Sequence, residues 1–274
     1  MTKMKKNSLT EEQIFKRKVV IRTIFSFGIF FILCIIGFKF FHALTDAPKD
    51  RGMPIPLREI SEVNAKIFER SYDNPALSKV FPKELAAKRA RVNGMIGMRD
   101  KLDTSNYFFK VVRYSKLTPQ LSDTLLISLD DLRHLPKTEV VFNFKCIEGW
   151  SQVSWWGGVR FSDFAKKYNL GTFNNLIPDT KNHPEQLLKY VGLQTPDKKY
   201  YVGIDMPSMM HPQTILCYEL NGKPLPMDQG SPLRLIIPVK YGIKHLKKVG
   251  TIFFSETPPP DYWADRGYDY FSGL

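Results

Sequence analysis

One stretch near the N-terminus limits what this chain can fold into more than any other feature of its sequence. Residues 23–38 carry no charge and are rich in Phe and Ile. The apolar stretch extends to residues 19–44 if Arg22 and Lys39 direct their charged groups toward an interface. A helix of that length crosses the roughly 30 Å hydrocarbon core of a bilayer. The sequence therefore predicts one transmembrane anchor at residues 19–44.

A cleaved signal peptide is the alternative interpretation, because basic residues precede an apolar run. The run is longer than the core of a typical signal peptide, and residues 40–44 offer no clean cleavage site between small residues. Seven Lys and Arg residues precede the run and three follow it closely, so the positive-inside rule predicts a cytoplasmic basic tail at residues 1–18. The rest of the chain would lie outside the cytoplasm, in the periplasm of a Gram-negative cell with its anchor in the inner membrane. No twin-arginine pair marks an export route.

The formal net charge of +13 does not by itself indicate a nucleic-acid-binding protein. Residues 1–45 hold eight Lys and Arg against two Glu, so they contribute +6 and leave +7 for the rest of the chain. The basic residues beside the predicted anchor are explained by its orientation in the membrane, and the rest of the chain is only moderately basic. The sequence also contains no nucleic-acid-binding motif.

Residues 45–90 follow the predicted anchor as a linker and helical segment. Prolines and a glycine in its first part predict an extended linker. Apolar residues recur at helical spacing from Ile60 to Ile67, and Pro82 in a first turn predicts a second helix at residues 83–89.

Residues 91–256 carry the signals of a folded domain. Strands are predicted at residues 107–113, 125–129, 139–145, 200–204, 214–220, 233–239 and 250–255. Helical spacing is confined to residues 161–168, with a short turn at 184–189. Asn221 and Gly222 predict a tight hairpin, because both tolerate positive φ. The sequence therefore predicts one α+β domain with mixed, mainly antiparallel sheets.

Three cysteines in 274 residues are too few for a disulfide framework, and none has the spacing of a zinc site. Cys146 follows an alternating strand that puts Phe142, Phe144 and Cys146 on one face, so the thiol emerges at a strand end. Three interpretations are open for it: a small buried apolar residue, a nucleophile, or a single soft ligand to a metal held mostly by other groups.

A second group of candidates lies further along the chain. Five basic residues occur near two glycines: Arg234, Lys240, Lys244, Lys247 and Lys248, close to Gly230 and Gly242. Cations beside glycines, which let a ligand approach the backbone, suit a phosphate-bearing cofactor. A solvated basic strand face is the alternative, and no glycine-rich nucleotide loop is present.

Together these regions resemble a known family. The run KCIEGWS at residues 145–151, followed by WGG at 156–158 and Phe161, is similar to the molybdenum-binding cysteine segment of the sulfite oxidase fold, especially of its periplasmic methionine-sulfoxide reductase branch. The runs HPQT (211–214), NGKPLP (221–226), GSPLR (230–234) and PVKYGIK (238–244) follow in the order of that family. The resemblance covers about residues 93–255 and implies a molybdopterin-dependent oxidoreductase with a sulfite oxidase-like fold.

The resemblance implies that Cys146 is the only protein ligand of molybdenum, with the dithiolene of molybdopterin and oxo groups in the other positions. A soft thiolate suits that metal, and the neighbouring Lys145 would help to keep the thiol ionised. The implied cofactor contacts, carried over residue by residue, are Asn93, Cys146, Thr195, Gln229, Arg234, Gly242, Lys244, His245 and Lys247. Gln229 departs from the reductase branch, which has asparagine there, and the segment around Asn93 differs as well.

His211 is a second catalytic candidate, because histidine exchanges a proton near neutral pH. The alternative is a structural histidine at a turn. A cysteine hydrolase with Cys146 as nucleophile and His211 as base is a further interpretation. Trp155 and Trp156 either wall a substrate funnel or pack around the cysteine turn.

The leading hypothesis is a membrane-anchored, extracytoplasmic molybdenum enzyme that transfers an oxygen atom and two electrons to or from a small substrate, such as a sulfoxide, an N-oxide or sulfite. The chain offers no ligand pair for haem or an iron–sulfur cluster, so a separate redox partner would exchange electrons with it, such as a membrane cytochrome b. A non-catalytic assembly subunit with the same fold is the alternative. The aromatic C-terminal extension at residues 257–274 either folds over the domain or meets a partner.

Overall fold

In the computed structural model, the chain divides into two units: residues 1–50 with 54–63, and residues 51–53 with 64–274. The structure describes residues 10–71, 77–92, 94–99, 106–114 and 123–273, without the side chains of residues 64–71. Helices and strands occur together in mixed, mainly antiparallel sheets, so the predicted α+β class is confirmed.

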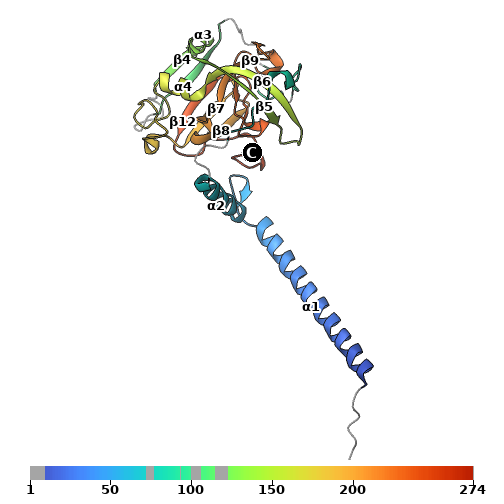
Figure 1. The fold of residues 1–274 in the computed structure, drawn as a ribbon. Helices are drawn as coiled ribbons and strands as arrows, with labels where there is room; N and C mark the ends of the chain where they lie inside the picture. Colours follow the sequence, from blue (N-terminus) through green and yellow to red (C-terminus); the bar gives the residue numbers. More distant parts are fainter. Residues whose placement is uncertain (1–9, 72–76, 93, 100–105, 115–122, 274) are drawn as a thin grey trace, which may run out of the picture. The chain divides into compact units, whose positions relative to one another are not determined.

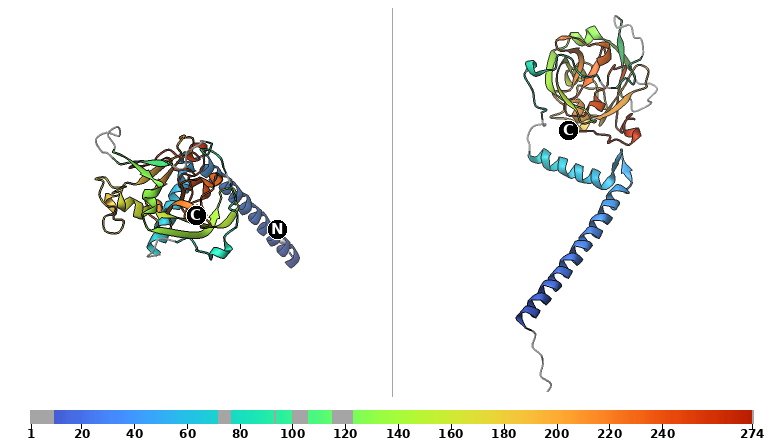
Figure 2. Two further views of the ribbon diagram at one scale, coloured as in Figure 1. Left: turned by 90° about the horizontal axis from the view of Figure 1, so that it is seen from above. Right: turned by 90° about the vertical axis from the view of Figure 1, so that its right-hand side faces the viewer.

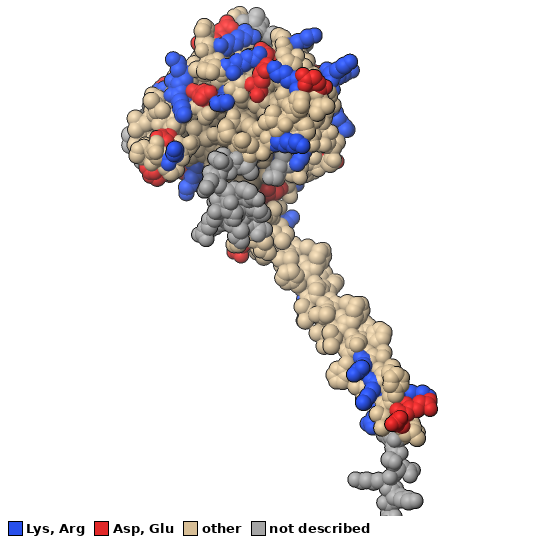
Figure 3. Space-filling model, viewed as in Figure 1, with Lys and Arg blue, Asp and Glu red and all other residues tan. Residues whose placement is uncertain are grey.

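The first unit is dominated by α1 (Glu11–Thr45), which starts with a capping box between Thr10 and Gln13. None of its side chains is buried. Figure 3 shows its middle free of charge, with Lys, Arg and Glu gathered near its N-terminal end. By length and composition, α1 can cross a membrane. The predicted helix is confirmed, and its location in a membrane stays a prediction.

After α1, the short strands β1 (Lys49–Asp50) and β2 (Met53–Pro54) form a two-stranded sheet. The helix α2 (Ile55–Ser71) follows and contains the helix predicted from the spacing of Ile60 and Ile67. It starts earlier than that spacing indicates, because Pro56 is tolerated in a first helical turn.

Two sheets of five strands form the second unit (Figures 1 and 2). The first sheet runs β10-β9-β6-β5, with β11 paired to β9, and every pair is antiparallel. The second runs β4-β3-β12-β7-β8, and only β3 and β12 are parallel within it. The first contains β5 (Lys137–Lys145), β6 (Ser151–Arg160), β9 (Ile215–Leu220), β10 (Lys223–Pro224) and β11 (Arg234–Ile236). The second contains β3 (Phe108–Val112), β4 (Thr124–Ser128), β7 (Tyr190–Gln194), β8 (Tyr201–Asp205) and β12 (Thr251–Ser255).

Three of these strands were missing from the predicted strands: the two-residue β10, and the longer β6 and β7. Both of the longer strands contain glycines, which lower the strand signal. In the fold these glycines admit neighbouring groups: a Cβ on Gly192 of β7 would lie 2.1 Å from the ring of Phe253. The seven predicted strands are all present, although β11 is shorter than predicted because Pro232 and Pro238 flank it and cannot donate to a ladder.

Helices of the second unit are short: α3 (Leu129–Arg133), α4 (Phe161–Lys167) and α5 (Met206–Met209), with 3-10 turns η1 (Lys83–Leu85), η3 (Pro184–Gln186), η4 (Met227–Gln229), η5 (Gly242–Lys244) and η6 (Ala264–Arg266). The predicted helix at residues 83–89 is wrong beyond η1. Ala86 is already extended, and the Ala87 amide donates to Val153 O at 3.0 Å instead of continuing a helix.

The main core lies between the two sheets and α4. Its buried residues come from all three, among them Phe109, Val159, Phe161, Phe164, Leu193, Leu216 and Ile252. A second cluster on the other side of the first sheet includes Val140, Phe142, Trp156, Cys217 and Ile236, with Phe144 packed against it. The predicted alternation of β5 is therefore confirmed, and it carries the chain along this second cluster to Cys146.

Gly158 of β6 lies close to the backbone of its neighbour β9. The register shifts between Gly157 and Gly158, and a Cβ on Gly158 would lie 2.2 Å from Leu216 O, which is a backbone atom. We expect Gly158→Ala to destabilise the full-length chain by about 1–3 kcal/mol, because backbone must move to admit the methyl group. The measurement is denaturant unfolding in detergent. The matched control is Gly157→Ala, whose new methyl group first meets the carboxylate end of the Glu219 side chain. Equal destabilisation by both variants would contradict the claim that the β9 backbone excludes a side chain at Gly158.

Candidate functional site

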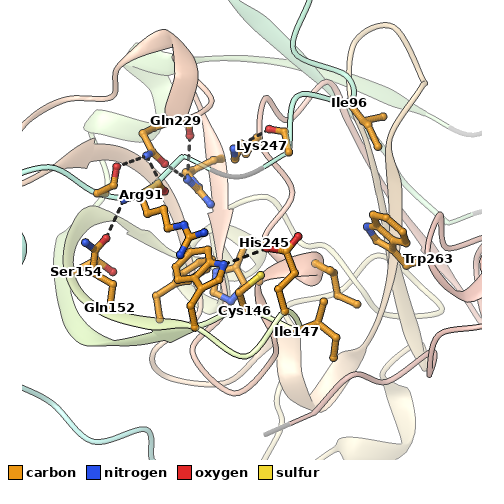
Figure 4. Close-up of a pocket in the computed structure, with 18 of the residues that line it drawn as sticks. Arg91, Ile96, Cys146, Ile147, Gln152, Ser154, Gln229, His245, Lys247 and Trp263 are labelled. Carbon is orange, nitrogen blue, oxygen red and sulfur yellow. Dashed lines mark hydrogen bonds between the residues drawn. The ribbon is translucent and has the colours of Figure 1, made fainter.

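One pocket of the second unit collects most of the residues singled out in the sequence (Figure 4). Six of the implied cofactor contacts line it: Cys146, Gln229, Arg234, Gly242, His245 and Lys247. They come from the end of β5, from the η4 turn, from β11 and from the segment around η5. Residues as far apart in sequence as Cys146 and Lys247 therefore meet in one place.

Cys146 opens the loop between β5 and β6. Its amide donates to Trp150 O at 2.9 Å, and the Gly149 amide donates back to Cys146 O at 3.0 Å. Gly149 has φ +89°, which favours glycine at this turn. Phe144 and Trp150 stack with ring centroids 5.9 Å apart. Cys146 is 5 % exposed and lines the pocket from this hydrogen-bonded turn.

Arg234 brings a buried positive charge to the same pocket. One of its terminal nitrogens donates to Gln229 O at 3.0 Å and to Gln229 Oε1 at 2.9 Å, while Nε has no hydrogen-bond partner in the described structure. Its guanidinium lies 4.6 Å from the centre of the Trp156 ring. Burial lowers the pKa of Arg234 to about 10. Within the described residues Arg234 forms no ion pair with a carboxylate, so its charge suits an anionic ligand.

Gln229 holds Arg234 in place. Its amide nitrogen donates to Ala90 O at 3.1 Å and to Arg91 O at 3.3 Å, which leaves its oxygen for Arg234. The following Gly230 has φ +100°, and a Cβ there would lie 2.9 Å from Lys247 Cβ. Gln229 therefore links the segment at residues 90 and 91 to the guanidinium.

Lys247 adds a second cation near Arg234. Its ammonium group donates to Gly94 O at 3.0 Å. Burial, together with the nearby charge of Arg234, lowers the pKa of Lys247 to about 8. Gly242 allows the segment to approach closely, because a Cβ there would lie 2.8 Å from the Phe144 ring. The pocket therefore combines the cations Arg234 and Lys247 with a close approach of the Gly242 backbone to Phe144.

His245 lies in the pocket wall as a neutral imidazole. Its Nδ1 accepts from the Ile237 amide at 3.4 Å, so Nε2 carries the proton and donates to Lys240 O at 3.1 Å. Burial lowers the pKa of His245 to about 3, with a further contribution from Arg234. The ring packs against Phe144 with centroids 4.7 Å apart. Both nitrogens are thus engaged by backbone groups.

Three other predicted residues are not among those that line this pocket. The Lys244 ammonium group binds Asp261 and also donates to Gly203 O at 3.1 Å. The Thr195 hydroxyl donates to Asp197 at 2.6 Å. His211 is buried and accepts from the Gln213 amide at 3.2 Å. The structure does not bring His211 to the pocket of Cys146, and Asn93 lies outside the described residues.

The pocket also contains residues that sequence reasoning missed or left open. Arg91, Ile147 and Tyr200 line it, and so do Trp263 and Tyr268 of the C-terminal extension. Trp156 lines the pocket, whereas Trp155 is not among the lining residues and carries Lys83 over its ring instead. The aromatic richness of residues 257–274 was the signal that could have indicated this wall.

The side chains that line the pocket fit a metal whose other ligands come from a cofactor. In the described part of the chain, no three side chains of His, Cys, Asp or Glu gather to hold a metal ion. Cys146 alone offers a soft donor in the pocket, and Arg234 and Lys247 offer charge for a phosphate. A thiolate ligand next to a phosphate site suits a metal bound to a phosphorylated organic cofactor.

Comparisons with known proteins agree with this donor set. The YedZ1 protein of Azospira oryzae, provisionally named a protein-methionine-sulfoxide reductase subunit, is 29% identical over 231 residues, which cover 84% of this chain and 80% of that protein. The protein-methionine-sulfoxide reductase catalytic subunit MsrP of Xanthomonas axonopodis pv. citri is 34% identical over 152 residues, or 54% of this chain. This chain spans about half the length of that relative, 47%.

Among solved structures, the sulfane dehydrogenase SoxCD of Paracoccus pantotrophus matches with a TM-score of 0.46 and 15% identity, over 58% of this chain and 40% of that one. Residues 98–263, more than half of the chain, match the oxidoreductase molybdopterin-binding domain. The chain therefore belongs to the family of molybdopterin-binding oxidoreductases.

Proposed function

We propose that this chain is a membrane-anchored, extracytoplasmic reductase of sulfoxides, with molybdenum held by Cys146 and by a molybdopterin whose phosphate lies at Arg234 and Lys247. The printed names of its relatives, which describe methionine-sulfoxide reductase subunits, support the sulfoxide as substrate. These names favour a sulfoxide over an N-oxide or sulfite as the substrate.

The observation that carries the proposal is the shared pocket of Cys146 and the buried charge of Arg234. A cysteine hydrolase would need a base beside the thiol, and His211 does not line the pocket. His245 does line it, but it is held neutral with both nitrogens bonded to the backbone, so it is poorly suited as a base. An anionic cofactor explains the cations, which a hydrolase would leave unexplained.

Each residue then has a defined task. Cys146 would hold the metal, Arg234 and Lys247 would bind phosphate oxygens, and Gln229 would keep the guanidinium oriented. Once bound, the molybdenum cofactor would supply two-electron oxygen-atom transfer, in which a sulfoxide takes up two electrons and two protons and leaves as a thioether and water. Phe144, partly buried in the lining of the same pocket as Cys146, would limit the access of water to the thiolate.

The N-terminal helix supports the membrane part of the proposal. The length of α1 and the excess of basic residues before it favour a single span with the second unit outside the cytoplasm. The electrons would come from a separate redox partner in the same membrane, for which a cytochrome b is a suitable class, since the sequence offers no haem ligand pair.

Replacing Cys146 tests the metal site. We expect Cys146→Ala to lose bound molybdenum and to lower sulfoxide reduction by at least about a thousandfold, because its thiolate is the proposed protein donor. Molybdenum and pterin are quantified on the purified full-length chain, and reduction of methionine sulfoxide is assayed with a reduced viologen dye.

The matched control is Cys217→Ala, which removes a buried thiol on β9 outside the pocket lining. That variant should keep its molybdenum. Full molybdenum content in Cys146→Ala, or a wild-type chain without pterin, would overturn the proposed function.

The proposed phosphate site has a pH dependence. The pKa of Lys247 is about 8 in the absence of an anion, so the side chain is charged below pH 8 and loses its charge above it. We therefore expect the affinity of the cofactor-free chain for sulfate, an oxyanion whose own charge does not change in this range, to fall severalfold between pH 7 and pH 9. Tryptophan fluorescence reports binding, because Trp150 and Trp156 line the pocket. In Lys247→Met the affinity should be lower and nearly independent of pH over this range; an unchanged pH profile would contradict the role of Lys247.

A further inference from the structure

The C-terminal segment, residues 257–273, supplies part of the pocket wall. Trp263 and Tyr268 both line the pocket, on either side of η6. The turn closes at Gly267 with φ +91°, and the Tyr268 amide donates to Trp263 O at 3.0 Å. The two rings meet edge to face with centroids 5.1 Å apart. They therefore form one aromatic unit.

This aromatic unit lies at a different end of the pocket from the cations. In Figure 4, Gln229 and Lys247 lie above Cys146, whereas Trp263 lies to the right of it, with Ile147 between Cys146 and Trp263 and with Ile96 above Trp263. A doubly charged phosphate would occupy the cationic side. The apolar side then remains for a neutral ligand with apolar substituents.

A buried ion pair holds the C-terminal segment in this place. The side chains of Lys244 and Asp261 are 1 % and 2 % exposed, and they bind each other directly. Asp261 also accepts hydrogen bonds from the Gly203 amide of β8, at 3.2 Å, and from the amides of Trp263 and Ala264, at 3.1 and 3.0 Å. One carboxylate thus joins η5, β8 and the turn that presents Trp263.

A second contact links the same elements. The Tyr200 hydroxyl donates to Ile243 O of η5 at 2.6 Å, and the Tyr200 ring packs on Tyr262 with centroids 5.2 Å apart. Tyr200 itself lines the pocket. Movement of the C-terminal segment would therefore displace the aromatic unit of Trp263 and Tyr268. The hydrogen bonds of Arg234 to Gln229 involve no residue of that segment.

We infer that Trp263 and Tyr268 form the substrate wall of the pocket, and that the Lys244–Asp261 pair positions them. The inference rests on the proposed function, because it takes the cationic end as the cofactor side. The ligand of the wall is a sulfoxide whose sulfur carries apolar substituents, such as the side chain of methionine sulfoxide, packed on the indole. Lys244 is then a positioning residue and does not bind the phosphate.

Kinetics of the full-length holoenzyme test this assignment. Asp261→Asn keeps the shape of the side chain but removes the charge that holds Lys244, and Trp263→Ala removes the wall itself. We expect each to raise the KM for methionine sulfoxide about tenfold with kcat within about twofold, because the wall binds substrate without entering the chemistry. The effect on the smaller dimethyl sulfoxide should be weaker. Pterin content per chain should stay that of the wild type.

The matched control is Asp265→Asn, four residues from Asp261, which removes the charge of an exposed carboxylate that accepts a hydrogen bond from Tyr201 and should leave KM unchanged. Chymotrypsin cleavage within residues 257–273 gives a readout independent of activity, and it should be faster in Asp261→Asn than in this control. If Asp261→Asn does not fold, Trp263→Ala still decides the question, since that side chain is partly exposed.

Two results would overturn the inference. In the first, either variant retains its pterin and shows a wild-type KM for methionine sulfoxide. In the second, Asp261→Asn loses its pterin while cleavage of the C-terminal segment is unchanged, which would assign the pair to the cofactor. A wild-type chain without pterin would instead refute the proposed function, and the cleavage comparison alone would then decide whether the ion pair holds the segment.

Discussion

The positive charge of Arg234 is the constraint on which the rest of the pocket depends. Burying a charge without a charged partner costs on the order of several kcal/mol. Around Arg234 the described structure places Gln229, the face of Trp156, the thiol of Cys217 and the nearby Lys247, which repels it. The surrounding elements are arranged around this charge: Gln229 ends η4, Gly230 lets Lys247 approach, and β11 fixes Arg234 against β9. A site of this kind is stable when an anion completes it.

Other buried cations of the same region have a different role, and the difference is physical. Lys244 pairs with Asp261, and the Lys240 ammonium lies 2.7 Å from an Asp205 carboxylate oxygen, so both charges are compensated within the protein. Arg234 has no such carboxylate among the described residues. Charge compensation thus separates cations that stabilise the fold from those that are available to a ligand.

The sequence predicted the strand that ends at Cys146, the hairpin at Asn221 and the cations of residues 234–247, because each depends on local spacing. Both residues of the hairpin turn have positive φ, at +52° for Asn221 and +71° for Gly222. Strands β6 and β7 escaped prediction because their glycines are explained only by partners from distant parts of the chain. The role of Lys244 could not be predicted, since Asp261 lies seventeen residues away and meets it only in the folded state. The aromatic residues of the C-terminal extension are evident in the sequence. Their contribution to the pocket also depends on contacts made only in the folded state, so it could not be predicted.

The most direct test of the anion site is the melting temperature of the cofactor-free, full-length chain, with and without millimolar inorganic phosphate, in wild type and in Arg234→Met. If Arg234 is held for an anion, phosphate should raise the melting temperature of the wild type and not that of the variant. Without phosphate, the variant should melt at or above the wild type, because the uncompensated charge is gone. A variant that melts well below the wild type, together with equal stabilisation of both by phosphate, would show that Arg234 serves the fold and that the anion binds elsewhere.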